Sequence, residues 1–312
     1  MSVVEKTAGV AVPKTAERRG PSLRSLGDNW WRHVIGVIVV IWALFPVAYV
    51  ISAAFNGDST LNGASLIPRS LTFHNFKQLF ASGTATKHFA SAADYPYWYK
   101  NTLIVSLATA FLSVMLGAMA AYAFSRFRFR GRRMGMLFLL LIQMFPQLGA
   151  VVAIYLIVYN VGGVFHVIGL NTITGLIVVY LGGVMGVNTW LMKGFFDTIP
   201  SELDESARVD GATPAQVFWG VVLPLAAPVL AVIALLSFIG TINEFIIASV
   251  ILQTSKHQTL PVGLFTFISG QYQQWWGPFA AGVLLAAIPV VVLMMSLQKF
   301  IVSGLTQGSV KG

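Results

Sequence analysis

Four acidic residues lie within nine positions of a chain that is 56% hydrophobic and only 10% charged. They are Glu202, Asp204, Glu205 and Asp210. Burying such carboxylates in hydrocarbon would cost roughly 2.5 kcal/mol or more each at a central position. The segment must therefore lie in water, where its charge favours contact with a basic protein partner.

The residues around this acidic group predict two short helices joined by a turn. Ser201 is a candidate N-cap, and Asp204 three residues later completes a variant of the capping box. Gly211 is placed to end the first helix, since glycine adopts the left-handed backbone of a C-cap without a Cβ penalty. Thr213 and Gln216 predict a second capping box, with a proline at the first helical position between them.

Glu244 is a second kind of candidate, because it is predicted well inside an apolar run without a Lys or Arg at the same depth. Two interpretations are open. In the first, Glu244 is structural, either as a hydrogen-bond anchor or as part of a helix pair with another subunit. In the second, Glu244 belongs to a transport pathway or gate. Gln143 and Asn243 are polar residues of the same kind, with the same choice between packing and pathway.

Catalytic and metal chemistry are not indicated. The chain has no cysteine, and its five histidines do not have metal-ligand spacing. No nucleophile and base pair is legible, and no G-x-x-x-x-G-K-[ST] phosphate loop occurs. The chain is thus predicted to be no enzyme, to hold no metal or cofactor, and to leave any MgATP to a partner.

The composition of the chain indicates a membrane protein. The mean hydropathy of +0.75 is far above that of soluble domains. Six apolar runs are long enough to cross about 30 Å of hydrocarbon. An all-α polytopic fold is therefore predicted, with spans at 34–55, 101–124, 135–159, 174–196, 225–252 and 278–301.

The distribution of positive charge gives the orientation and argues against a nucleic-acid partner for the net charge of +9. With the N-terminus in the cytoplasm, all but five of the 20 Lys and Arg residues lie on the cytoplasmic side, as the positive-inside rule requires. Residues 1–29 are then a flexible cytoplasmic tail preceding a transmembrane domain of 30–312. Residues 197–224 form a cytoplasmic loop, residues 56–100 an outer loop, and residues 303–312 a cytoplasmic C-terminal tail.

The outer loop ends in "DYPYWYK" at residues 94–100. Such aromatic residues are typical of the belt at a membrane interface. A platform on which a sugar stacks is the alternative interpretation.

One spacing pattern resembles a known family. Binding-protein-dependent ABC importer permeases carry the pattern E-A-A-x3-G-x9-I-x-L-P in a cytoplasmic loop. The chain matches every spacing, with Ser206 in place of alanine and Val221 in place of isoleucine. The positions of the pattern are occupied by Glu205, Ser206, Ala207, Gly211, Val221, Leu223 and Pro224.

The resemblance extends over residues 34–312, through "QMFP", "GLNTITG", "VDGATPAQVF" and "GLTQGSVKG". These segments are similar to the second permease subunit of maltose/maltodextrin importers. The resemblance implies a type I permease fold in the bacterial inner membrane. It also implies as partners a different permease, two ATP-binding subunits and an extracytoplasmic sugar-binding protein, besides membrane lipid.

The resemblance also implies roles for three groups of residues. The loop with the motif is expected to dock in a cleft of the ATPase, through Glu202, Glu205, Ala207, Asp210, Gly211, Leu223 and Pro224. The C-terminal residues are expected to reach between the ATPases: Gly308, Ser309, Val310, Lys311 and Gly312. An outer turn takes the place of a loop that enters the binding protein: Gln253, Thr254, Ser255, Lys256 and His257.

Alternatives remain at each level. The motif loop could be an inert surface loop, and the C-terminal residues could be a plain flexible end. The cargo could be trehalose, another disaccharide or a polyol instead of maltose or maltodextrin. From a different class, the chain could be a secondary transporter that uses Glu244 as a proton or cation site.

Overall fold

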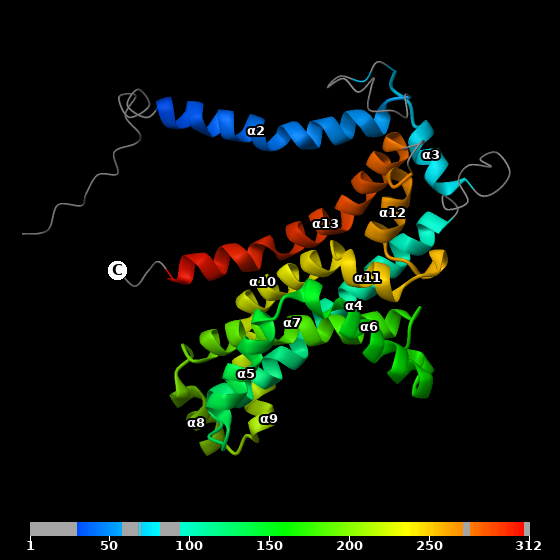
Figure 1. The fold of residues 1–312 in the computed structure, drawn as a ribbon. Helices are drawn as coiled ribbons and strands as arrows, with labels where there is room; N and C mark the ends of the chain where they lie inside the picture. Colours follow the sequence, from blue (N-terminus) through cyan, green and yellow to red (C-terminus); the bar gives the residue numbers. More distant parts are fainter. Residues whose placement is uncertain (1–29, 58–67, 69, 82–93, 271–274, 309–312) are drawn as a thin grey trace, which may run out of the picture. The chain divides into compact units, whose positions relative to one another are not determined.

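The computed structural model describes residues 30–57, 68, 70–81, 94–270 and 275–308, and the chain divides into two units, residues 1–49 and 50–312. The predicted tail 1–29 lies outside the described residues. The predicted all-α class is confirmed, since the described residues are helical apart from turns and one isolated antiparallel bridge between Asn56 and Leu71 (Figure 1).

Five helices are long and apolar enough to cross a membrane, and a bent pair of helices would make a sixth crossing. The count agrees with the six predicted spans. The helices of membrane length are α2 (Trp30–Phe55), α4 (Tyr95–Arg126), α7 (Ile173–Phe196), the run Pro214–Ile242 and α13 (Trp276–Gly308).

The third predicted span, 135–159, is not one straight helix. It is broken into α5 (Arg132–Met144) and α6 (Gln147–Val164), whose axes differ by 106°. Pro146 stands at the break as the N-cap of α6. A proline lacks the N–H of an interior helical bond and its ring clashes with the preceding turn, so the span breaks at this point.

The fifth predicted span, 225–252, also ends early. Helix α10 (Leu223–Ile242) stops at Ile242, and the chain restarts as the short α11 (Ile246–Ile251). Glu244 therefore lies between two helices and not well inside one.

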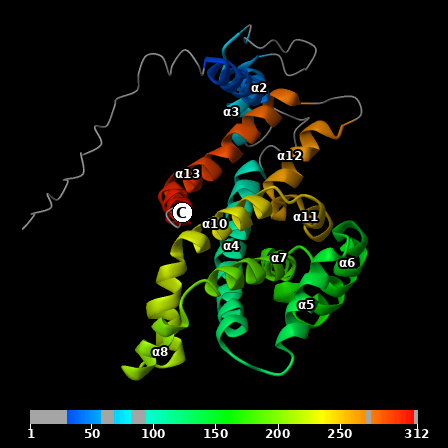
Figure 2. The same ribbon diagram turned by 90° about the vertical axis from the view of Figure 1, so that its left-hand side faces the viewer.

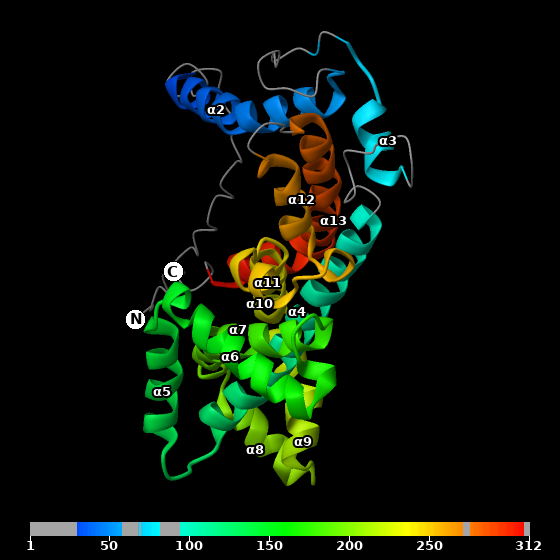
Figure 3. The same ribbon diagram turned by 45° about the vertical axis from the view of Figure 1, so that its right-hand side comes forward.

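Helix α4 is the central element of the second unit, since it packs against both α7 and α10, while α13 packs against α10 and α12 (Leu260–Ile268). Two short helices, α8 (Ser201–Val209) and α9 (Pro214–Val217), lie beside the C-terminal end of α4. Figures 2 and 3 show α8 at one end of this unit, far from α11 and α12. We name these two regions the α8 end and the α12 end.

The aromatic group at 94–100 belongs to the start of α4, which begins six residues before the predicted span. Tyr95 and Trp98 are fully buried, and Trp98 packs edge-on against Phe267 of α12. The interface-belt interpretation and the sugar-platform interpretation are both wrong for these two side chains. They are core residues that join α4 to α12 and α13.

Smaller elements complete the α12 end. They are α3 (His74–Phe80) and the 3-10 turns η3 (His166–Ile168) and η5 (Ser255–His257). The buried amide of Asn75 in α3 donates to the backbone oxygens of Ala54 at 3.0 Å and of Asn56 at 2.8 Å. Asn75 thereby satisfies carbonyl groups that the last turn of α2 leaves without a helical partner.

We predict that Gly263→Ala destabilises the chain, because a Cβ at this position would lie 2.1 Å from Cδ2 of Trp98. Trp98 cannot retreat, since it is fully buried and its Nε1 donates to the oxygen of Ser255 at 2.7 Å. Overpacking of this kind costs about 1–3 kcal/mol. The measurement is the thermal unfolding midpoint of the purified chain in detergent.

The matched control is Gly240→Ala, since Gly240 is also helical and a Cβ there meets nothing within 4 Å. Alanine is the better helix former, so this variant should unfold at the parental temperature or above. Equal midpoints for the two variants would contradict the packing account.

Candidate functional site

The turn after α8 is built as the sequence predicts, around Gly211. This residue has φ of 86°, in the left-handed region that glycine tolerates best. The N–H of Ala212 donates to the oxygen of Ala207 at 2.9 Å, and that of Gly211 to the oxygen of Arg208 at 3.0 Å. These two bonds are the Schellman motif, which closes a helix C-terminus sharply.

The second helix also begins as predicted. Thr213 accepts from the backbone N–H of Gln216 at 3.3 Å, and Oε1 of Gln216 accepts from the N–H of Thr213 at 2.7 Å. This reciprocal pair is a capping box with Pro214 at the first helical position. The turn between α8 and α9 is therefore fixed at both sides by hydrogen bonds.

Helix α9 is not a separate short helix that ends before the next span. It passes through a π turn, η4 (Phe218–Val222), directly into α10, and the N–H of Leu223 donates to the oxygen of Phe218. Pro224 gives the reason, because a proline cannot donate to the oxygen four residues earlier and its ring crowds that carbonyl. The wider turn accommodates the proline without breaking the helix.

The predicted N-cap at Ser201 is wrong. Pro200 occupies the N-cap position, no side chain caps the helix, and Ser201 is its first residue. The reason is that Asp204 is turned inward: its Oδ2 lies 2.8 Å from Nε of Arg126 at the end of α4. The side chains of this ion pair are only 4% and 10% exposed.

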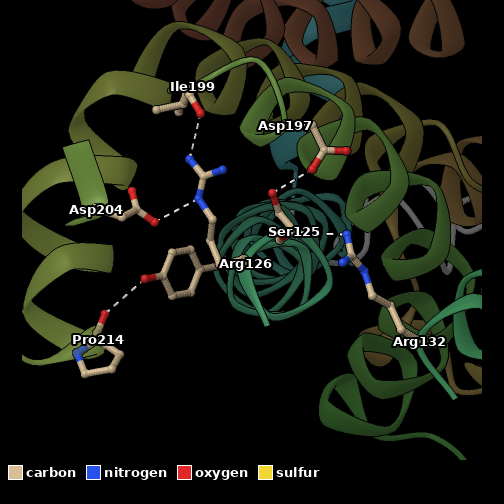
Figure 4. A network of polar contacts seen from close by, with 8 residues as sticks. Ser125, Arg126, Arg132, Asp197, Ile199, Asp204 and Pro214 are labelled. Atoms are coloured by element: carbon tan, nitrogen blue, oxygen red, sulfur yellow. Dashed lines mark hydrogen bonds and ion pairs between the residues drawn. The ribbon is translucent and has the colours of Figure 1, made fainter. Parts of the chain in front are cut away.

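Further polar contacts surround the Arg126–Asp204 pair (Figure 4). Nη2 of Arg126 donates to the oxygen of Ile199 at 2.9 Å, and the hydroxyl of Tyr122 donates to the oxygen of Pro214 at 3.4 Å. The last residues of α4 thus contact the segment before α8 and the start of α9. Both short helices are tied to one span.

A second ion pair lies close by at the end of α7. Asp197 accepts from Ser125 at 2.7 Å and pairs with Lys193 one turn earlier. Burial raises the pKa of Asp197, but the hydrogen bonds from Lys193 and Ser125 and the charges of Lys193 and Arg132 outweigh it and hold the pKa below its ordinary value. Asp197 therefore stays charged at neutral pH.

An apolar core lies behind these contacts. The buried Val217 and Phe218 pack with Tyr122, and the rings of Tyr122 and Phe218 are 5.1 Å apart. Ala207 and Ala212, the two residues joined by the Schellman bond, pack against the same cluster. A small side chain at 207 lets α8 lie close to the core.

The solvent-exposed carboxylates of this element lie on α8 and directly after it. Glu202, Glu205 and Asp210 are exposed, while Leu223 is half-buried and Pro224 is exposed at the start of α10. Glu202 also lies in the first turn of α8, where a carboxylate suits the positive end of the helix dipole. The arrangement presents a mainly acidic surface on a rigid turn, beside the exposed Arg208, and such a surface can bind a basic protein groove.

Glu244 is engaged in hydrogen bonds at the break before α11. Its Oε1 accepts from the N–H of Ile247 at 2.8 Å, and its Oε2 accepts from the N–H of Ala248 at 3.0 Å and from the hydroxyl of Tyr180. These backbone groups belong to the first turn of α11, which has no intrahelical acceptors. The geometry fits the anchor interpretation of Glu244.

The other two polar candidates also bond to the backbone. Nε2 of Gln143 donates to the oxygen of Gly183 at 2.5 Å, which ties α5 to α7. Nδ2 of Asn243 donates to the oxygen of Ile239 at 2.8 Å, and this exposed residue borders a mainly apolar cavity of about 630 Å³ between α10, α12 and α13. The contact of Gln143 thus favours packing, whereas Asn243 has access to open space.

The outer turn at 253–257 is held against the body of the protein. Oδ1 of Asn171 accepts from the N–H groups of Gln253 at 2.7 Å and Thr254 at 2.8 Å, and Asn101 donates to the oxygen of Lys256 at 2.9 Å. Four of its residues are exposed: Gln253, Thr254, Lys256 and His257. A contact with a binding protein would therefore use a fixed surface.

Gly308 is the last residue of α13, and residues 309–312 lie outside the described residues. The sequence also missed residues that hold the site together. Arg126 has no local signal beyond its positive charge, Tyr122 has none, and Asn171 lies in a segment that indicated the family but no structural role.

The comparisons with known proteins agree with this architecture. Residues 113–307 match the family model of the binding-protein-dependent transport system inner membrane component. The chain is 39% identical over 280 residues to the galactooligosaccharides transport system permease protein GanQ of Bacillus subtilis, covering 90% of this chain and 94% of that one. It is 37% identical over 295 residues to the maltose/maltodextrin transport system permease protein MalG of Yersinia pestis, covering 93% and 94%.

A solved structure gives the same result for the fold. A crystal structure of a bacterial ABC transporter involved in the import of the acidic polysaccharide alginate matches with a TM-score of 0.72 at 23% identity, over 91% of this chain and 99% of that one. The likeness confirms the predicted permease fold. With the family match over more than half of its residues, the chain belongs to the family of binding-protein-dependent transport system inner membrane components.

Proposed function

We propose that this chain is one permease subunit of an ATP-driven importer that moves maltodextrin-type oligosaccharides across the inner membrane. The observation that carries the proposal is the alignment with sugar permeases at 37–39% identity over nine-tenths of the chain. The matched family region, 113–307, includes the whole α8–α9 element. The chain's part is to form the passage and to convert movement of partner ATPases into movement of its helices.

The proposal places the α8 end in the cytoplasm, with both chain termini on the same side. The basic segment from the turn after α4 to the start of α5 supports this orientation, because Arg128, Arg130, Arg132 and Arg133 lie close together there. The exposed acidic face of α8 then meets a basic cleft of an ATP-binding subunit, and residues 308–312 contact the same subunits. The fixed turn at 253–257 faces the sugar-binding protein outside.

Two observations bear on the alternatives. The relative GanQ is named for galactooligosaccharides, which makes these sugars the second candidate cargo. Glu244 directs both carboxylate oxygens to the backbone of α11 and to Tyr180, so it is poorly placed to bind a proton or cation that must leave again. This geometry supports ATP over an ion gradient as the proposed energy source.

The function is tested in proteoliposomes that contain the whole importer, with its binding protein supplied in turn with maltotriose and with a β-galactotriose. We expect maltotriose to stimulate ATP hydrolysis at least tenfold and to enter the vesicles only with ATP inside. Stimulation by the galactose trimer alone would assign the second candidate cargo. Uptake driven by an ion gradient without ATP would contradict the proposal.

If α8 docks on an ATP-binding subunit, two different substitutions in this element should both reduce sugar-stimulated ATP hydrolysis. Glu205→Lys reverses an exposed charge at the dock, and Gly211→Val forces a β-branched residue to φ of 86°, at a cost of order 1–3 kcal/mol. Both variants should insert and assemble yet lose at least nine-tenths of the sugar-stimulated ATP hydrolysis in nanodiscs. Full stimulation in both would show that α8 is not the dock.

The orientation is tested with single cysteines, which suits a chain that has none. A cysteine at the exposed Glu202 should react only with membrane-permeant reagents in intact cells, and one at the exposed Lys256 should also react with impermeant ones. The reverse pattern would place the α8 end outside. Permeabilised cells, in which both positions should react, provide the control.

A further inference from the structure

The buried pair of Arg126 and Asp204 joins two elements that are far apart in sequence and have different tasks. Arg126 is the last residue of the central span α4, and Asp204 lies in the first half of α8. Their side chains are 10% and 4% exposed, although α8 otherwise directs its carboxylates to water. A buried carboxylate requires compensation, and the nearest charge is that of Arg126.

The geometry of the contact shows what kind of compensation this is. Nε of Arg126 lies 2.8 Å from Oδ2 of Asp204, but the N–H bond does not point along this line, and within the described residues neither oxygen of Asp204 has a hydrogen bond of good geometry. The attraction is therefore chiefly between the two charges. Asp204 depends on Arg126 more than Arg126 depends on Asp204, because Arg126 also donates to Ile199.

Within the described part of the chain, the pair is the only ion pair that joins α8 to another element. Ala207 meets the core with a single methyl group. Tyr122 of α4 makes a second tie, since its hydroxyl donates to α9 at the longer distance of 3.4 Å and its side chain also interacts with the exposed Arg208 of α8. A helix of nine residues is too short to keep its position by itself. We infer that the Arg126–Asp204 pair is the joint that makes α8 and α4 move as one body, so that force from the ATPase reaches α4 directly as well as α10.

This inference rests on the proposed function and names Arg126 and Asp204 as positioning residues, since neither is exposed to a partner. It is tested in the assembled importer with spin labels on cysteines at two exposed positions, Met119 of α4 and Val209 of α8. Double electron–electron resonance gives the distribution of distances between the labels. ATP hydrolysis is measured in the same nanodiscs with and without sugar-loaded binding protein.

Asp204→Asn removes the charge and keeps the shape. We expect a broadened distance distribution together with at least a tenfold loss of sugar-stimulated hydrolysis. The reversed pair, Arg126→Asp with Asp204→Arg, should narrow the distribution again and recover stimulation. The control is Lys193→Gln, which removes one charge from the other ion pair at this end, where both partners lie at the end of α7 and Asp197 is 43% exposed. It should leave both readings within twofold of the parent.

If Asp204→Asn keeps the parental distance distribution, the pair does not hold α8 to α4 and the inference is wrong. If the distribution broadens but sugar-stimulated hydrolysis stays parental, the pair has no role in coupling. Should Asp204→Asn fail to reach the membrane, Arg126→Lys keeps the charge and removes the bond to Ile199. It should retain stimulation within threefold, and a tenfold loss would overturn the assignment to charge. If the parent importer itself shows no sugar-stimulated hydrolysis, the proposed function fails instead.

Discussion

Backbone N–H and C=O groups must find partners wherever a helix stops inside an apolar protein, and this requirement organises the structure. Glu244 supplies acceptors to the first turn of α11, and Asn171 supplies one to the turn that follows α11. Asn75 supplies donors to the last turn of α2. Each of these side chains is polar in an apolar setting for the same reason. They allow the spans to be interrupted where a straight helix would be simpler.

The same requirement explains how far the sequence could predict the site. Gly211, Thr213 and Gln216 satisfy backbone groups within five residues of themselves, so their roles follow from local pattern and were predicted correctly. Ser201 has the local pattern of an N-cap but fails, because Asp204 is drawn to a residue 78 positions earlier. A contact of that range has no signature in the composition of either segment. The buried start of α4 at Tyr95 and Trp98 was mistaken for an interface for the same reason.

Span boundaries show the corresponding limit for the fold. Hydropathy gave six apolar runs, and six crossings are compatible with the structure when the bent pair is one of them. Hydropathy averages over about 19 residues, so it cannot register breaks as short as those at Pro146 and Asn243.

Polar residues of the interior also make contacts between helices that are far apart in the sequence. Nδ2 of Asn188 donates to Ser113 at 3.2 Å and to Ser237 at 2.9 Å, so this group joins α4, α7 and α10 to one another.

The π turn at Phe218–Val222 has a geometric consequence for the faces of its helix. Phe218, Val222, Ala226 and Leu230 are all buried at intervals of four residues. At about 100° per residue, three such intervals advance about 120° beyond three full revolutions, so an uninterrupted α-helix would rotate Leu230 away from the side that Phe218 occupies. The wider π turn rotates the chain by a smaller angle per residue, so it removes part of this extra rotation between Phe218 and Leu230. One helix can therefore keep a continuous buried apolar stripe from Phe218 through the π turn to Leu230.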